Sequence, residues 1–372
     1  MKKISILAVA ALAMFSCSKN VNVNPDVPAT GNQVAFTGMI SNMNRGSYTA
    51  MDDKANTVVA IDGDKFGVFM SDQSNNVVVA NAEFTFEDNM MKADYSTTPA
   101  NGLTWQTLVD ASNTTPKLNF YSYYPYDSNV TDGKNISIEI PSTQTMGEKD
   151  AEGNYTTQRT VTANDFLYSE NVSTAKDPNQ TIMFDKNSVP TSRTVNFHYK
   201  HALAFVEFNI VKNQAIADNI WFDGLTLDGT KIYNTAKFDL KESKLTVTKT
   251  AKALTIAPDD NILGQDTCKL ITETDKANSK VIYQMLVMPM DATTLLADSK
   301  IALECKKNTD DDYSGATELK VGQSFPVGTK WEAGKRYKYN LIVSENTVRI
   351  VLLSIDDWEE QAPEDLPATP IA

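Results

Sequence analysis

The residues best suited to bind a metal ion or transfer a proton are the only two histidines, His198 and His201. They lie in a segment, 194–211, whose many β-branched and aromatic residues favour a β-strand. Successive side chains of a strand point to opposite faces, so residues three positions apart cannot bind one metal ion together. Two histidines and three cysteines are also too few for most zinc sites. We therefore predict a structural histidine within a sheet, and no metal or other cofactor.

Acidic and aromatic residues offer two further kinds of site. Asp310–Asp312 could attract a hard cation but lacks the spaced ligands of a calcium loop, which favours a solvated turn between strands. Other carboxylates could be paired as in glycosidases, but nothing in the sequence selects a pair. Four tryptophans could stack on sugars, although burial in a β-sandwich core is the more usual role: Trp105, Trp221, Trp331 and Trp358.

The chain has none of the common catalytic motifs: G-x-S-x-G, H-E-x-x-H, a P-loop or G-x-G-x-x-G. Its 34 Lys and Arg against 47 Asp and Glu give a net charge of −13, so it lacks the general basic surface that binds phosphate backbones. The 22% of charged residues and 41% of hydrophobic residues are typical of a folded chain. We predict a protein that is not an enzyme and has no nucleic-acid partner.

The N-terminus has the features of an export signal. Lys2 and Lys3 precede an uncharged apolar run, residues 4–15, which is too short to span a bilayer. Ser16-Cys17 follows, and the chain then becomes polar. We interpret residues 1–16 as a lipoprotein signal peptide, with Cys17 thioether-linked to diacylglycerol and anchored in lipid. The alternative is an ordinary signal peptide that ends near a cysteine.

The other two cysteines, Cys268 and Cys305, leave two alternatives open. Outside the cytoplasm they could form a disulfide bond. On neighbouring strands they could equally be plain buried thiols.

Short alternating segments, such as Ile136, Ile138 and Ile140 between polar residues, recur along the chain and predict an all-β protein built of antiparallel sandwiches. Residues 17–32 are rich in Asn, Pro and Ser and read as a flexible tether. The length suits about two domains. A polar break at 185–193 predicts the boundary between an N-terminal domain, 33–190, and a C-terminal domain, 191–372.

An ordered series of segments resembles the fimbrillin family of Bacteroidetes, the lipoprotein pilins and adhesins of type V pili. No single segment is specific, and the resemblance rests on their order over nearly the whole mature chain: VAFT (34–37), DGDKFGVF (62–69), LNFYSYYPY (118–126), DFLY (165–168), VNFHYKHALA (195–204), WEAGKRYKY (331–339) and Trp358.

The resemblance implies two tandem transthyretin-like β-sandwich domains, and export as a lipoprotein to the outer membrane and the cell surface. It also implies that a trypsin-like protease cuts behind the first strand, after Arg45 or alternatively Lys54. Loss of that strand would open a groove, which a strand of another subunit fills. The removable strand would carry Val34, Phe36 and Met39.

Physical arguments agree with this mechanism. Residues 41–47 are mostly small and polar, as in exposed segments that proteases cut. Loss of the first strand would remove roughly 4–9 kcal/mol of apolar burial, which a donor strand would recover by β-augmentation. The candidate donor strand carries Val348, Ile350 and Leu352, whereas the tail after Trp358 contains three prolines and is a poor donor.

We therefore expect a structural or adhesive pilus subunit, with stalk and tip positions both open. Its expected partners are other pilus subunits, outer-membrane lipid through Cys17, the processing protease and, for an adhesin, a ligand on a host or bacterial surface. The alternative is a glycan-binding surface lipoprotein of a carbohydrate-uptake system. A secreted β-sandwich hydrolase is a third interpretation.

Overall fold

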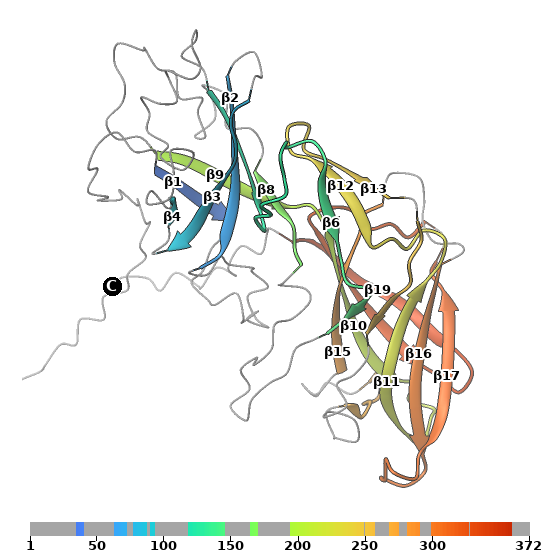
Figure 1. The fold of residues 1–372 in the computed structure, drawn as a ribbon. Coiled ribbons are helices and arrows are strands. Elements are labelled where there is room, and N and C mark those ends of the chain that lie inside the picture. The colour runs from blue at the N-terminus through green and yellow to red at the C-terminus, as the bar shows by residue number, and fades with distance from the viewer. Residues whose placement is uncertain are drawn as a thin grey trace, which may run out of the picture.

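The computed structural model describes residues 35–40, 63–72, 77–87, 90–93, 118–145, 164–169, 194–248, 250–256, 268–274, 281–290, 299–326 and 328–358. These segments contain strands β1 to β19 and no α-helix, which confirms the predicted all-β class (Figure 1). Consequently, no helix in the described part of the chain could cross a membrane.

Seven strands form a closed sheet in the N-terminal half. In sheet order they are β1 (Ala35–Ile40), β4 (Met90–Ala93), β3 (Val77–Glu87), β2 (Lys65–Asp72), β5 (Leu118–Tyr124), β8 (Leu167–Ser169) and β9 (Thr194–His201). All neighbours are antiparallel except β1 and β9, which run parallel and close the barrel. Alternating aromatic residues of these strands fill the interior, among them Phe66, Phe84, Phe120, Phe197 and Tyr199.

The C-terminal half is a sandwich of two sheets. One contains β15 (Val281–Val287), β10 (Ala204–Lys212), β18 (Lys335–Val343) and β19 (Val348–Asp357), in that order. The other contains β17 (Thr317–Ser324), β16 (Lys300–Asn308), β11 (Asn219–Asp228), β14 (Leu254–Ile256) and β7 (Thr143–Gln144). A shared core joins both sheets, with Val206, Phe208, Phe222, Leu303, Tyr339 and Leu341 among its members.

The position of β10 in the sheet explains why its sequence is so apolar. It lies between β15 and β18, and its side chains are buried on both faces. Ala204, Val206 and Phe208 face the sandwich core, whereas Phe205 joins the core of the barrel. A central strand covered on both sides can carry apolar residues on both faces, and in β10 only the buried Glu207 and Asn209 interrupt the apolar run before Lys212.

The two halves are interleaved along the chain. Strand β6 (Ile136–Glu139) pairs with β12 (Thr235–Asp239), which also pairs with β13 (Lys244–Val247), and β7 pairs with β14. The chain then passes from the barrel to the four-stranded sheet between His201, the end of β9, and Ala204, the start of β10. The polar break at 185–193 precedes β9 and therefore lies before this change. Ala202 and Leu203 at the change itself are buried, so no polar linker marks it in the sequence.

Candidate assembly site

Strand β1 occupies the position that closes the barrel. Its six residues pair in parallel with β9, from Ala35 opposite Thr194 to Ile40 opposite Tyr199. On its other side it pairs with β4, where Phe36 lies opposite Met91. The strand is thus held by main-chain pairing on both sides, and its removal would leave β9 and β4 with open edges.

The predicted removable residues lie partly on this strand. Phe36 and Met39 are opposite Val195 and His198 of β9. Val34 lies outside the described residues, as do Cys17, Arg45 and Lys54. Lipidation and processing therefore stay predictions.

Strand β9 depends on β1 over most of its length. Its residues 199–201 also pair with β8, as Ser169 opposite Tyr199, Tyr168 opposite Lys200 and Leu167 opposite His201. Within the described part of the chain, residues 194–198 have β1 as their only sheet partner. Loss of β1 would therefore leave β9 attached by three register pairs at its C-terminal end.

The candidate donor strand, β19, lies at the edge of the four-stranded sheet. It pairs with β18 over nine register positions, so it belongs to its own sheet before any exchange. Val348 at its start is buried and Ile350 packs against the sandwich core, whereas Leu352 is 48% exposed. Leu353, the extra residue of a β-bulge, is 48% exposed, and Ile355 is 53% exposed. The second half of β19 thus presents apolar side chains to solvent.

The opposite edge of the same sheet is blocked by a side chain. Gln144 is buried, and its amide donates to the Leu286 carbonyl of β15 at 2.8 Å. The Leu286 N–H donates to Oε1 of Gln144, also at 2.8 Å. A side chain that satisfies both main-chain groups prevents a strand from pairing at this point. Of the two edges, β19 is therefore the more open in the described structure.

These features coincide with a family match that covers most of the chain. A model of the family described as fimbrillin-like matches residues 53–358. The chain belongs to the fimbrillin-like family. The match begins after β1, so the closing strand precedes the matched part of this fimbrillin-like chain. No curated protein is significantly similar to it in sequence.

Solved structures share the fold of this fimbrillin-like protein. A fimbrial protein from Bacteroides vulgatus gives a TM-score of 0.53 at 15% identity, over 88% of this chain and 99% of that one. A "putative cell adhesion protein" from Bacteroides ovatus gives a TM-score of 0.50 at 15% identity, over 89% of this chain and 99% of that one. At these identities the likeness establishes the fold alone.

Of the two histidines in the fimbrillin-like barrel, the side chain of His201 is described, and it has a structural role within the sheet, as predicted. His201 is buried, and its Nδ1 lies 2.7 Å from Oδ2 of buried Asp165. Among the described residues, no three or more His, Cys, Asp or Glu side chains are grouped to hold a metal ion. Sequence reasoning missed Asp165 as the partner, because it stands 36 residues away in a segment with no distinctive spacing.

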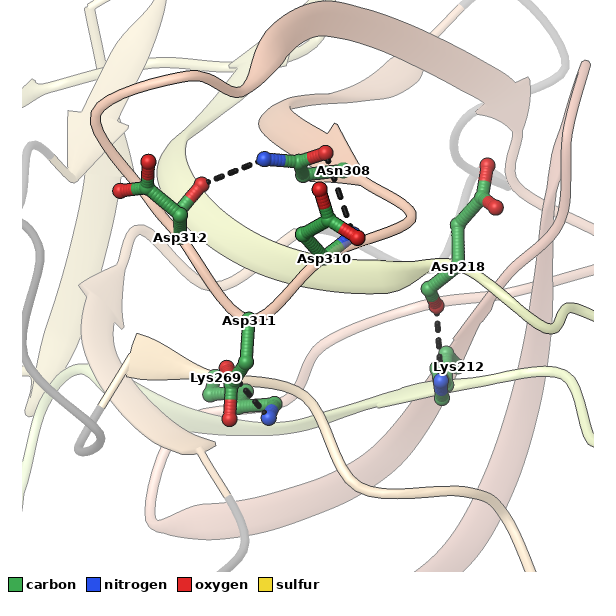
Figure 2. A network of polar contacts seen from close by, with 7 residues as sticks. All are labelled: Lys212, Asp218, Lys269, Asn308, Asp310, Asp311 and Asp312. Atoms are coloured by element: carbon green, nitrogen blue, oxygen red, sulfur yellow. Dashed lines mark hydrogen bonds and ion pairs between the residues drawn. The ribbon is translucent and has the colours of Figure 1, made fainter.

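The acidic turn between β16 and β17 uses its polar groups internally (Figure 2). Asn308 Nδ2 donates to the Asp312 carbonyl at 2.7 Å, and Asp311 forms an ion pair with Lys269 at 2.7 Å. The side chain and the N–H of Ser314 donate to the Asp312 carboxylate and lower its pKa. Asp310, Asp311 and Asp312 are exposed, which confirms the predicted solvated turn.

Aromatic and thiol side chains are similarly enclosed. Trp221, Trp331 and Trp358 are buried, so none of the described tryptophans offers an open face to a sugar; Trp105 lies outside the described residues. Cys268 and Cys305 are buried thiols that are not joined in a disulfide bond, the second of the two alternatives. Burial, with smaller contributions from nearby carboxylates, raises the pKa of Cys305 to about 12.

Proposed function

We propose that this fimbrillin-like protein is a structural or adhesive subunit of a cell-surface fimbrium and has no catalytic role. The observation that carries the proposal is the position of β1. It is paired on both sides, it closes the barrel, and it precedes the residues that match the family. The two proteins of the same fold, described as a fimbrial protein and a "putative cell adhesion protein", support the same role.

The proposed assembly step is an exchange of strands between subunits. A trypsin-like protease cuts after Arg45, or alternatively Lys54, and releases the segment that contains β1. The main-chain groups of β9 and β4 that had paired with β1 then need new partners, since a buried unpaired group costs about 1–3 kcal/mol. A strand from a second copy restores the pairing by β-augmentation.

The proposed donor is β19 of that second copy. The four-stranded sheet has its open edge there, and Leu352, Leu353 and Ile355 expose apolar side chains that an acceptor groove could bury. Burial of a large apolar side chain contributes about 1.5–3 kcal/mol. Removal of β19 from its own sheet costs its pairing with β18, which sets the barrier to exchange.

Export places the subunit where it can assemble. We propose that Cys17 carries the lipid that anchors the precursor in the outer membrane, and that cleavage behind β1 separates the mature subunit from this anchor. The partners are then other pilus subunits, the processing protease and, for an adhesive subunit, a surface ligand.

The test uses the purified Cys17→Ser chain and a trypsin-like protease. We expect a new N-terminus after Arg45 or Lys54, by N-terminal sequencing, and oligomers by size-exclusion chromatography and electron microscopy. Double variant Arg45→Gln/Lys54→Gln should stay uncut and monomeric. The matched control, Arg45→Lys/Lys54→Arg, keeps both cut sites and should assemble. Cleavage without oligomers, or oligomers of the uncut variant, would contradict the proposal.

A further inference from the structure

Trp358 anchors the far end of β19 to the barrel. It directly follows Asp357, the last residue of the strand, and is only 4% exposed. Its indole stacks on the ring of His201, with centroids 3.8 Å apart and planes 12° apart. It also stacks on Phe205 at 5.3 Å. A residue at the end of an edge strand in the second half is thus held by the last residue of β9 and by β10.

A main-chain relay joins the same elements. The Trp358 N–H donates to the Gly334 carbonyl at 2.7 Å, and the Gly334 N–H donates to the Leu203 carbonyl at 2.8 Å. Gly334 has a φ of +70°, a conformation that other residues rarely adopt. The end of β19 is therefore bound to the β9–β10 connection through both its backbone and its side chain.

The rest of β19 has no comparable anchor. From Arg349 to Asp357 every residue is exposed or only partly buried, and the buried residues stand at the two limits, Val348 and Trp358. Ile350 packs on the sandwich core near the first limit. Beyond it, the strand is held by edge pairing with β18, by the ion pair between Lys335 and Asp357, and by the side chain and N–H of Trp358. Loss of the Trp358 contacts would therefore free the second half of β19 selectively.

His201, on which Trp358 stacks, adjoins the part of β9 that loss of β1 would weaken. His201 is bound to Asp165 and pairs with Leu167 of β8, one of three register pairs that β9 keeps without β1. Residues 194–198, which pair with β1 alone in the described structure, would lose their sheet partner. Motion of a strand held by so short a ladder would reach the His201 ring.

We propose that Trp358 is a positioning residue for strand exchange: it latches β19 in the unprocessed subunit, and loss of β1 releases the latch through β9 and His201. This inference rests on the proposed function, because it takes β19 as the strand that a second copy of this chain receives. It adds an order of events. The donor strand becomes available only after the acceptor groove has opened, which prevents premature assembly.

Hydrogen exchange by mass spectrometry tests the latch on the Cys17→Ser chain. In the uncut protein, Trp358→Ala should lower the protection of amides 351–357 by about 100-fold, since truncation of a buried tryptophan is among the most costly core changes. Trp358→Phe keeps a six-membered aromatic ring on His201 and loses the smaller ring of the indole with its N–H, which has no hydrogen-bond partner among the described residues. It should retain most of the protection. The matched control is Trp221→Ala, an equally buried tryptophan on β11 of the other sheet, and it should leave amides 351–357 within about threefold of wild type.

Processing tests the coupling. Wild-type protein cut by the protease, held dilute enough to stay monomeric, should show the same loss of protection at 351–357 as uncut Trp358→Ala. Unchanged exchange of β19 in Trp358→Ala would overturn the latch, and retained protection after removal of β1 would overturn the coupling. Oligomer formation, measured in parallel, separates this inference from the proposed function. If wild type forms oligomers while the hydrogen exchange of β19 stays unchanged, only the inference is contradicted. If the hydrogen exchange of β19 changes as expected but no oligomers form, only the proposed function is contradicted.

Discussion

Glu207 and Arg336 form a buried ion pair across the parallel strands β10 and β18, where Nη2 of Arg336 donates to Oε2 of Glu207 at 2.5 Å. Gln284 on β15 donates to the same oxygen at 3.0 Å. Nε and Nη1 of Arg336 have no hydrogen-bond partner among the residues that the structure describes, and the guanidinium lies 5.2 Å from the ring centroid of Phe205. The charge of Arg336 is therefore balanced by one carboxylate, in a place with little access to water.

Loss of that carboxylate should be costly. Glu207→Gln leaves the Arg336 charge buried and uncompensated, so we expect a loss of about 3–5 kcal/mol in the free energy of unfolding, measured by chemical denaturation. The double variant Glu207→Leu/Arg336→Met removes both charges and should cost much less. Lys320→Met, which breaks the exposed pair with Glu304, is the control and should change the free energy of unfolding little. Equal losses from Glu207→Gln and Lys320→Met would show that the buried charge needs no partner.

Buried tyrosines predict a loss of stability in alkali. Burial raises the pKa of Tyr123 and of Tyr339 to about 12 from the ordinary 10.0, and it also raises the pKa of Tyr199 and Tyr283. The folded state thus holds these protons more tightly than the unfolded chain does. The corresponding stability is complete below pH 10 and declines as the pH rises from 10 towards 12.

Denaturation at a series of pH values, followed with tyrosinate absorbance, measures this decline. Tyr199→Phe removes one buried hydroxyl and leaves Ser122 its hydrogen bond to the Gly67 carbonyl, so the decline should be shallower. A free energy of unfolding that stays constant from pH 10 to about 12 would refute the argument.

The local alternation of apolar and polar residues was sufficient to predict the all-β class of the fold. Ile136 and Ile138 alternate with polar residues, and the structure buries the former and exposes the latter. The aromatic run at 118–124 forms β5 of the barrel. The order of such segments also led to the fimbrillin family, which the family match confirms.

Partners distant in sequence could not be predicted in this way. Asp165, His201 and Trp358 meet at one place but come from three separate segments, and strand periodicity carries no information on which strands pair. The parallel pairing of β1 with β9 is of the same kind. Val348, Ile350 and Leu352 lie on one strand, as predicted. The sequence did not show that the start of this strand is packed at Val348 while its second half is exposed, because this depends on how far the opposite sheet extends.

Gly67 on β2 provides a test of packing in the barrel. A methyl group at this position would overlap Cε1 of the Tyr123 ring. The ring cannot move easily, because its hydroxyl donates to Oδ1 of Asn81 at 2.8 Å. Gly67→Ala should therefore destabilise the protein by roughly 3 kcal/mol, measured by denaturant or thermal unfolding. Gly133→Ala, whose methyl group would meet Leu240 at an ordinary 3.5 Å, is the control and should have little effect. Similar unfolding curves for the two variants would mean that the barrel adapts around Tyr123.

The two buried thiols give a direct chemical prediction. In the Cys17→Ser chain, Cys268 and Cys305 should not react with a thiol reagent while the protein is folded, because both are buried. The raised pKa of Cys305, about 12, also keeps its thiol protonated at neutral pH, and the thiolate is the reactive form. Both should react after unfolding in denaturant without reductant, as counted by mass spectrometry. Protein purified from an oxidising compartment provides the strictest sample. If neither thiol reacts until a reductant is added, the cysteines are joined in a disulfide bond and the free-thiol arrangement is wrong.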